Sequence, residues 1–227
     1  MPLYRPSELR TFLDSLGVRA KKSLSQNFLV DGNIVKKIIQ LAQVTSIDTI
    51  LEIGPGPGVL TEELVQHAKR VIAVEMDRAF AEALHRLSGV EVVSCDILKF
   101  DMSCLPEKTK VVANIPYHIT TPIIEQMVAS RRIQSATLMV QKELAERIAA
   151  KPATREFSSL SLFVQYHAKV TYGFQVPAGC FYPKPKVESA VIRLDFDAAK
   201  KYPAISDDEA FEKFFRTAFQ QRRKTLS

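Results

Sequence analysis

Residues 50–64 read ILEIGPGPGVLTEEL, an apolar run that passes through a glycine-rich turn into a polar, helix-like segment. The turn contains three glycines: Gly54, Gly56 and Gly58. The pattern predicts a buried strand before the turn and a helix that begins near Leu60 or Thr61. Glycine adopts backbone conformations closed to other residues and lets the chain approach a ligand. In α/β sheets, such a turn at the carboxyl end of a strand typically binds a nucleoside cofactor.

Strand-like and helical segments alternate around this turn. Runs rich in Val and Ile predict buried strands at residues 49–53, 70–74, 90–94, 110–113 and 136–140. The helical spacing of Ile34, Ile38 and Leu41 predicts a helix over residues 34–44, capped by Asp31 or Asn33. This alternation is typical of a doubly wound α/β fold with a mostly parallel sheet.

The pattern changes after Lys151. Two strand-like runs, 160–170 and 189–196, predict an antiparallel pair that closes one edge of the sheet. Residues 197–203 are typical of a linker, and residues 207–221 return to helical spacing with a stripe of aromatic side chains: Phe211, Phe214, Phe215 and Phe219. The stripe favours a packing surface over a ligand site. We therefore expect one domain over residues 1–198 and the start of a small helical domain over 199–227.

The composition excludes several classes of protein. With 227 residues, of which 46% are hydrophobic, the chain has enough apolar material for a sizeable core. Three cysteines without a CxxC pair and four scattered histidines predict neither a disulfide framework nor a metal site. No apolar run approaches the roughly 20 residues that cross a bilayer. We expect a cytoplasmic protein, and the net charge of +6 is compatible with a polyanionic partner.

The cofactor loop favours an adenosyl group over a dinucleotide. The dinucleotide pattern G-x-G-x-x-G fails, because its last position holds Val59 counted from Gly54 and Thr61 counted from Gly56. A second strand ends at Glu75, whose carboxylate is suited to accept hydrogen bonds from both ribose hydroxyls. A third strand is followed by Asp96, suited to the amino group of an adenine. The alternative, a tight turn beside two solvated carboxylates, explains less of this pattern.

The fourth strand ends in NIPY, which is Asn114, Ile115, Pro116 and Tyr117. The exocyclic amine of adenine is a poor nucleophile because its lone pair is delocalised into the ring. Two acceptors, the Asn114 side-chain oxygen and a carbonyl in the Ile115–Pro116 segment, would draw the amine toward tetrahedral geometry. Proline fixes the backbone so that a carbonyl faces outward, and Tyr117 can stack on the base. The alternative interpretation of NIPY is a turn that merely ends a strand.

With these motifs in place, the sequence resembles the RNA adenine dimethyltransferase family along essentially its whole length. It is most similar to the enzymes that dimethylate two adjacent adenines near the 3′ end of small-subunit ribosomal RNA. The resembling segments are SLSQNFLVD (23–31), EIGPGPGVLT (52–61), NIPYHITTP (114–122) and FYPKPKVESAV (181–191). The resemblance implies a Rossmann-like class I methyltransferase with a seven-stranded sheet, which uses S-adenosylmethionine and acts on small-subunit RNA in the pre-30S particle. Nothing in the sequence suggests an obligate assembly, so we expect a monomer.

The resemblance also implies roles for individual residues. The implied cofactor pocket consists of Asn27, Leu29, Gly54, Gly56, Glu75, Asp96 and Asn114. The implied catalytic set consists of Asn114, Pro116, Tyr117 and Phe181, with Phe181 facing Tyr117 across a flipped adenine. Other interpretations remain open for two of them, because Phe181 also suits the core and Asn27 also suits a helix cap.

Three departures from the family pattern stand out. His118 stands where the family commonly has Asn, and Glu188 where it commonly has Asp. The ending FFRTAFQQRRKTLS is similar to the start of the family's helical C-terminal domain, and the rest of that domain is absent, which implies weaker docking of RNA. Basic residues expected to contact phosphates are Arg147, Lys151, Arg155, Lys184, Lys186, Arg222, Arg223 and Lys224.

Three other functions compete with this hypothesis. A resistance-type enzyme acting on large-subunit RNA belongs to the same class, although FYPKPKVES and RRKTL favour the small-subunit branch. A non-catalytic RNA-binding assembly or transcription factor would tolerate loss of Gly54, Glu75 or Asn114, and all three are present. A nicotinamide oxidoreductase lacks its third glycine.

Overall fold

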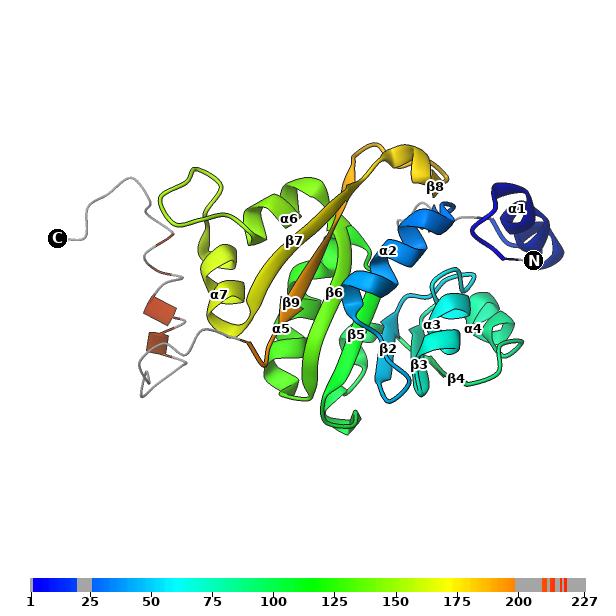
Figure 1. Cartoon of the computed structure of the whole chain (residues 1–227), viewed down its shortest axis with the longest axis horizontal. Helices are drawn as coiled ribbons and strands as arrows, with labels where there is room; N and C mark the ends of the chain where they lie inside the picture. The colour runs from blue at the N-terminus through cyan, green and yellow to red at the C-terminus, as the bar shows by residue number, and fades with distance from the viewer. Residues whose placement is uncertain are drawn as a thin grey trace.

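A computed structural model describes residues 2–19 and 26–198, together with residues 210, 211, 213, 214, 217 and 219. Its centre is a seven-stranded sheet in the order β4-β3-β2-β5-β6-β9-β7 (Figure 1). The strands are β2 (Thr49–Ile53), β3 (Arg70–Glu75), β4 (Val90–Ser94), β5 (Thr109–Asn114), β6 (Ile133–Gln141), β7 (Lys169–Val176) and β9 (Ser189–Asp195). Strands β2 to β6 pair in parallel, and β9 lies antiparallel between β6 and β7. This confirms the expected Rossmann-like, mostly parallel seven-stranded sheet.

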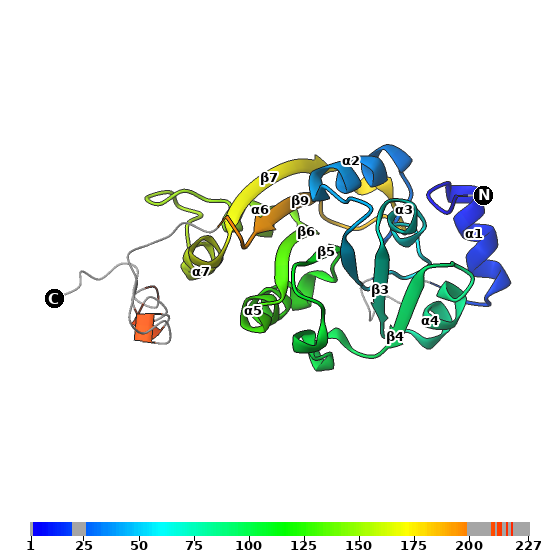
Figure 2. The same cartoon turned by 60° about the horizontal axis from the view of Figure 1, so that its bottom comes forward.

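Alternate side chains of the central strands enter two separate cores, because successive residues of a strand point to opposite faces. On β2, Leu51 and Ile53 belong to one core and Ile50 to the other. Helices α5 (Thr120–Ser130), α6 (Lys142–Ile148) and α7 (Ser159–His167) supply the first core. Helices α2 (Gly32–Ala42) and α3 (Thr61–His67) supply the second. Figure 2 shows α2 and α5 on opposite faces of the sheet, as a doubly wound fold requires.

The N-terminal helix α1 (Pro6–Ser15) lies at one end of the molecule, beside α4 (Arg78–Leu84). Its buried Leu9 and Leu13 pack with Phe28 and Phe80 in a third, smaller core. Phe28 belongs to β1 (Phe28–Leu29), which pairs antiparallel with β8 (Phe181–Tyr182). The sequence had not predicted this two-stranded sheet.

The prediction of a strand over residues 160–170 is wrong. These residues form most of α7, because Ser158 and Ser161 make a reciprocal cap at its start. The strand begins later, as β7, and it does pair antiparallel with β9 at one edge of the sheet. The error arose because a short helix rich in Leu, Phe and Val has the same apolar density as a buried strand.

The other boundaries are close to expectation. Helix α2 is capped by Asp31, whose Oδ1 accepts hydrogen bonds from the backbone of Asn33 (2.9 Å) and Ile34 (3.2 Å).

At the C-terminal end, Ala210 and Phe211 are helical, and the Phe211 ring centre lies 5.0 Å from that of Tyr166 on α7. Residues 199–209, Phe215 and residues 220–227, which include Arg222, Arg223 and Lys224, lie outside the described residues. The expected domain boundary therefore stays a prediction. No helix in the described ranges combines the length and apolar character needed to cross a membrane.

Candidate active site

The parallel strands end around a cavity of about 370 Å³. Its wall is formed by the ends of β2, β3 and β5, the segment after β4, and β1 from the N-terminal region. This position is the topological switch point, since β3 and β5 extend the sheet on opposite sides of β2. Nine of the ten residues singled out from the sequence line it: Asn27, Leu29, Gly54, Gly56, Glu75, Asp96, Asn114, Pro116 and Tyr117. The volume is suited to a small-molecule ligand.

Glu75 holds the glycine loop in place from the end of β3. Its Oε2 accepts a hydrogen bond from the backbone N–H of Gly56, and its Oε1 accepts one from Asp77, both at 2.8 Å. Gly54 and Gly56 have φ angles of 63° and 56°, in the left-handed region that favours glycine. A Cβ on Gly56 would also approach the Phe28 ring to 3.2 Å. Burial raises the pKa of Glu75, and the amide hydrogen bonds only partly oppose this.

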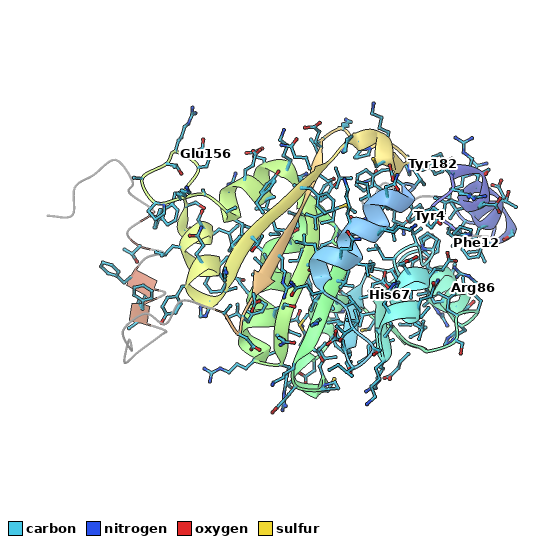
Figure 3. The ribbon with its side chains drawn as sticks, in the orientation of Figure 1. Tyr4, Phe12, His67, Arg86, Glu156 and Tyr182 are labelled. Atoms are coloured by element: carbon cyan, nitrogen blue, oxygen red, sulfur yellow. The ribbon has the colours of Figure 1, made fainter. Side chains whose placement is uncertain are left out.

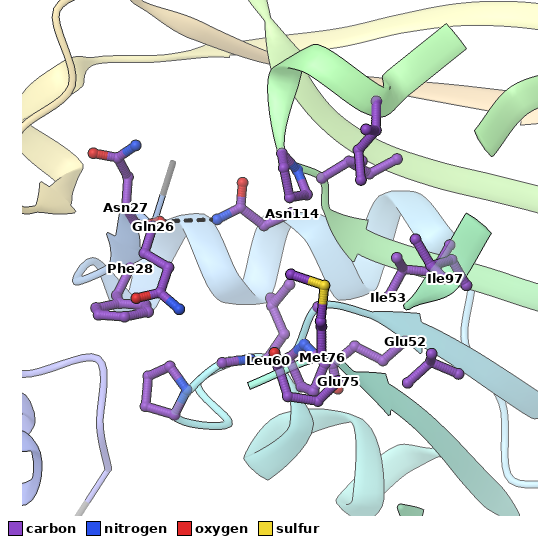
Figure 4. Close-up of a pocket in the computed structure, with 18 of the residues that line it drawn as sticks. Gln26, Asn27, Phe28, Glu52, Ile53, Leu60, Glu75, Met76, Ile97 and Asn114 are labelled. Carbon is purple, nitrogen blue, oxygen red and sulfur yellow. Dashed lines mark hydrogen bonds between the residues drawn. The ribbon is translucent and has the colours of Figure 1, made fainter. Parts of the chain in front are cut away.

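The end of β5 presents Asn114 to the same cavity. Its Nδ2 donates a hydrogen bond of 3.1 Å to the backbone carbonyl of Asn27, shown dashed in Figure 4. That bond orients the carboxamide and leaves Oδ1 as an acceptor. The Pro116 carbonyl accepts the Ile119 N–H at 3.2 Å, whereas the Ile115 carbonyl receives no backbone donor from the described residues. Of the two carbonyls considered from the sequence, that of Ile115 is therefore the one with both lone pairs available.

Tyr117 opens the short 3-10 helix η4 (Tyr117–Ile119) directly after this turn. Its hydroxyl is hydrogen bonded to that of Ser189 at 2.7 Å, which fixes the ring against the first residue of β9. Burial raises the pKa of the Tyr117 phenol, and the bond to Ser189 opposes this only in part. The ring is thus a neutral aromatic surface at the mouth of the cavity.

Phe181 is the one predicted site residue that does not line the cavity. Strand β8 pairs it with Leu29, and the ring is 4% exposed in the core with Val176 and Val191. The alternative left open from the sequence, that Phe181 is a core residue, describes its position in this structure. A stacking role against Tyr117 stays a prediction.

Several lining residues were missed from the sequence. Phe28 reaches the cavity from β1, and Met76 and Leu98 line it although they are 51% and 42% exposed. Glu52 on β2 is 1% exposed, and its Oε2 has no hydrogen-bond partner among the described residues. A carboxylate inside the apolar run ILEIG was a visible signal for Glu52, since buried charges are rare without a function.

Glu52 also gives the folded chain a distinctive pH dependence. Burial, reinforced by the nearby charge of Glu75, raises the pKa of Glu52 from 4.5 to about 8. The pKa of Glu52 is therefore about 4.5 in the unfolded chain and about 8 in the folded chain. At a pH between these values the unfolded chain has lost a proton that the folded chain keeps, so the free energy of unfolding falls as the pH rises from about 4.5 to about 8. In Glu52→Gln this dependence is absent. We therefore expect the Tm of Glu52→Gln, measured without ligand, to rise relative to that of the unaltered chain across this range.

The control for this prediction is Glu82→Gln, which removes an exposed carboxylate from α4. Its Tm should follow that of the unaltered chain at every pH. A Tm difference between Glu52→Gln and the unaltered chain that stays constant with pH would show that Glu52 is ionised in the folded state.

The charges around the cavity favour a cationic ligand. Three carboxyl groups line it, from Glu52, Glu75 and Asp96; Glu52 keeps its proton below about pH 8, so Glu75 and Asp96 supply the negative charge, and the described lining contains no Lys or Arg. A pyrophosphate would meet repulsion here, whereas a sulfonium or ammonium group would be stabilised. Gly54 leaves open space where a Cβ would stand, so a ligand can lie directly on the backbone. The residues present thus fit S-adenosylmethionine better than a dinucleotide.

Structural comparison places this fold among the methyltransferases. The dimethyladenosine transferase of Plasmodium falciparum aligns with a TM-score of 0.78 and 32% identity, over 88% of this chain and 73% of that one. The 23S rRNA methyltransferase ErmE aligns with a TM-score of 0.73 and 29% identity, over 88% and 81%. In class, the chain is a Rossmann-like methyltransferase.

Sequence comparison then gives the family. Residues 17–227 match the model of the family described as ribosomal RNA adenine dimethylase. The ribosomal RNA small subunit methyltransferase A of Protochlamydia amoebophila is 46% identical, over 100% of this chain and 83% of its own. The protein of the same name from Chlamydia trachomatis serovar D is 44% identical, over 97% and 81%. The chain belongs to the ribosomal RNA adenine dimethylase family.

Proposed function

We propose that this chain transfers methyl groups from S-adenosylmethionine to the N6 amine of two adjacent adenines in the 3′-terminal hairpin of small-subunit (16S) ribosomal RNA. The product is N6,N6-dimethyladenosine, the substrate is the pre-30S particle, and the chain acts as a monomer in the cytoplasm during ribosome biogenesis. The observation that carries this proposal is the orientation of Asn114, which shares one cavity with the glycine loop. The small-subunit relatives, at 46% and 44% identity, favour this RNA over that of ErmE, at 29%.

The residues of this chain that would hold the cofactor are Asn27, Leu29, Gly54, Gly56, Glu75, Asp96 and Asn114. Glu75 is placed for the ribose hydroxyls, because its carboxylate lines the cavity and retains acceptor capacity beside its bonds to the backbone amides of Gly56 and Asp77. Asp96, whose Oδ1 already accepts the N–H of Leu98 at 3.0 Å, is placed for the adenine amine. Gly54 and Asn27 complete the wall beside Leu29. When bound, the cofactor supplies an activated methyl group on its sulfonium.

The residues at the end of β5 prepare the attacking amine. Asn114 Oδ1 and the Ile115 carbonyl accept the two N6 hydrogens, so the lone pair leaves conjugation with the ring and points into the cavity. Pro116 holds this backbone in place, and Tyr117 stacks on the extruded base. No side chain has to act as a general base of matched pKa, since alignment and exclusion of water carry the step. N6 carries a positive charge after each transfer and releases one proton to solvent. The neutral monomethyl amine formed by the first transfer then has its lone pair available for the second, which uses a second cofactor molecule.

Binding of RNA is expected to depend on salt through the basic segment between β8 and β9. Lys184 and Lys186 are exposed there, and the segment runs into Ser189, the partner of Tyr117. Raising the salt from about 50 to about 200 mM should weaken RNA binding, because phosphate contacts release counterions. Lys184→Gln combined with Lys186→Gln should lower the slope of log affinity against log salt by about one to two.

The matched control removes two charges near the amino ends of the parallel strands, away from the cavity at their carboxyl ends. Lys69 and Lys108 precede β3 and β5 and are exposed there. Lys69→Gln combined with Lys108→Gln should leave the slope, measured by fluorescence anisotropy with a small-subunit hairpin, unchanged. Equal slopes for both double variants would contradict the assignment of Lys184 and Lys186.

Methylation mapping on both ribosomal RNAs tests the proposed substrate. The chain and S-adenosylmethionine are incubated with unmethylated particles of either subunit, and modified adenines are located by primer extension. We expect two adjacent modified adenines in the 3′-terminal hairpin of the small-subunit RNA. Modification of large-subunit RNA alone would favour the resistance-type function, and absence of any cofactor binding would favour a non-catalytic assembly factor.

A further inference from the structure

Arg86 joins three parts of the chain outside the cavity. It lies just beyond the end of α4, and its Nη2 donates hydrogen bonds to the Pro57 carbonyl at 2.9 Å and to Glu62 Oε1 at 3.0 Å. Its Nη1 donates to the Ala83 carbonyl at 3.0 Å, which anchors the guanidinium to its own helix. The guanidinium carbon also lies 4.5 Å from the ring centre of Phe12 on α1. Figure 3 shows Phe12 and Arg86 close together at this end of the molecule.

The partners of Arg86 belong to the glycine loop and to α1. Pro57 lies between Gly56 and Gly58 in the loop and lines the cavity. A Cβ on Gly58 would meet Arg86 Nη2 at 3.2 Å, so the guanidinium packs directly against the loop. Glu62 sits in the first turn of α3, and its second oxygen accepts the Leu3 N–H at 3.0 Å. A single cation thus links the outer side of the loop to the N-terminal segment.

Helix α1 also reaches the inner side of the loop. Leu9 and Leu13 pack with Phe28, whose ring lines the cavity and contacts Gly56. The loop is therefore held between two groups that both depend on α1, Arg86 on the outside and Phe28 on the inside. The left-handed φ of Gly56 and Gly58, 56° and 97°, are conformations that such contacts help to maintain.

We propose that Arg86 is a positioning residue for the cofactor loop, through which cofactor binding and docking of α1 strengthen each other. The inference rests on the proposed function, because it takes the loop to bind S-adenosylmethionine and the product S-adenosylhomocysteine. Coupling of this kind is reciprocal: if docked α1 favours the binding-competent loop, then the bound cofactor favours docked α1. Two separate measurements must therefore change together.

The first measurement is the affinity for S-adenosylhomocysteine by isothermal titration calorimetry. Arg86→Gln should raise Kd about tenfold, because it removes charged hydrogen bonds to Pro57 and Glu62. Arg86→Lys keeps the charge but not the planar fork, so it should give an intermediate Kd. Phe12→Leu keeps apolar packing and removes the cation–π contact, and it should raise Kd about threefold. The matched control, Arg70→Gln, breaks the exposed pair of Arg70 with Glu91 and should change Kd less than about twofold.

The second measurement is amide hydrogen exchange over α1, with and without S-adenosylhomocysteine. In the unaltered chain and in Arg70→Gln, the ligand should slow exchange in α1, although α1 does not line the cavity. In Arg86→Gln at a saturating ligand concentration, this added protection should be lost. A residue that only supported the fold would lower protection equally with and without ligand.

The outcomes separate this inference from the proposed function. Equal Kd values for Arg86→Gln and Arg70→Gln, or exchange in α1 that is indifferent to ligand in the unaltered chain, would overturn the role of Arg86 alone. Failure of the unaltered chain to bind S-adenosylhomocysteine would overturn the proposed cofactor and this inference with it.

Discussion

Replacing Asn114 with Ala is expected to lower kcat by about 100- to 1,000-fold, the usual cost of removing one preorganised hydrogen-bonding group from a reacting centre. The physical reason is that, in the proposed mechanism, Oδ1 is one of the two acceptors that hold the target amine at the end of β5. The carboxamide is held in orientation by its bond to the Asn27 carbonyl. Without it, the amine keeps its lone pair in the ring and attacks poorly.

The measurement is single-turnover methyl transfer to a small-subunit particle, with cofactor affinity determined separately. Kd for the cofactor should rise far less than kcat falls, because Glu75 and the glycine loop remain. Asn114→Asp restores the acceptor but loses the donor to Asn27, so it should recover only part of the rate. Asn33→Ala, an exposed asparagine on α2, serves as the control and should behave as the unaltered chain. Full turnover in Asn114→Ala would refute the assignment.

Replacing Glu75 with Ala is expected to weaken cofactor binding by about 100-fold or more, since hydrogen bonds to charged groups contribute most among such contacts. The Glu75 carboxylate has two roles. It holds the N–H groups of Gly56 and Asp77, and it faces the proposed ribose. Its loss therefore removes a ligand contact and loosens the loop at the same time.

Glu75→Gln separates the two roles only partly. One amide oxygen can replace one carboxylate oxygen, but the amide NH2 would face a second backbone donor, either Gly56 or Asp77. We therefore expect an affinity loss close to that of the Ala variant, measured by calorimetry with S-adenosylhomocysteine. Glu91→Gln changes an exposed carboxylate on β4 and should bind normally. Normal affinity in Glu75→Gln would contradict the role of this carboxylate in the loop.

Most of this site could be predicted from the sequence because its residues follow consecutive strands. Gly54, Glu75, Asp96 and Asn114 each lie at the end of one strand or within two residues after it, and parallel strands bring those ends together. The order of strands along the chain is thus enough to gather the residues. The same logic holds for the two cores, since alternation along β2 already separates Ile50 from Leu51.

Features that depend on pairing between segments far apart in the chain could not be predicted from the sequence. The side on which Phe181 lies depends on its register with Leu29, which is 152 positions earlier in the chain and belongs to an element of two residues. A shift of one residue would turn its ring to the other side. The helical state of residues 160–167 depended on the Ser158–Ser161 cap, a weaker signal than the apolar run beside it. The contact of Arg86 with Phe12 likewise joins segments that no local pattern connects.

The central claim is that the groups at the end of β5 direct successive methylation of an adenine amine in small-subunit RNA. It is tested most directly by mass analysis of nucleosides from small-subunit particles of cells that lack this protein, before and after addition of the chain with S-adenosylmethionine. We expect N6,N6-dimethyladenosine to be absent at first and to appear at two residues per particle. Particles that gain no methylated adenosine, or gain only the monomethyl form, would contradict it.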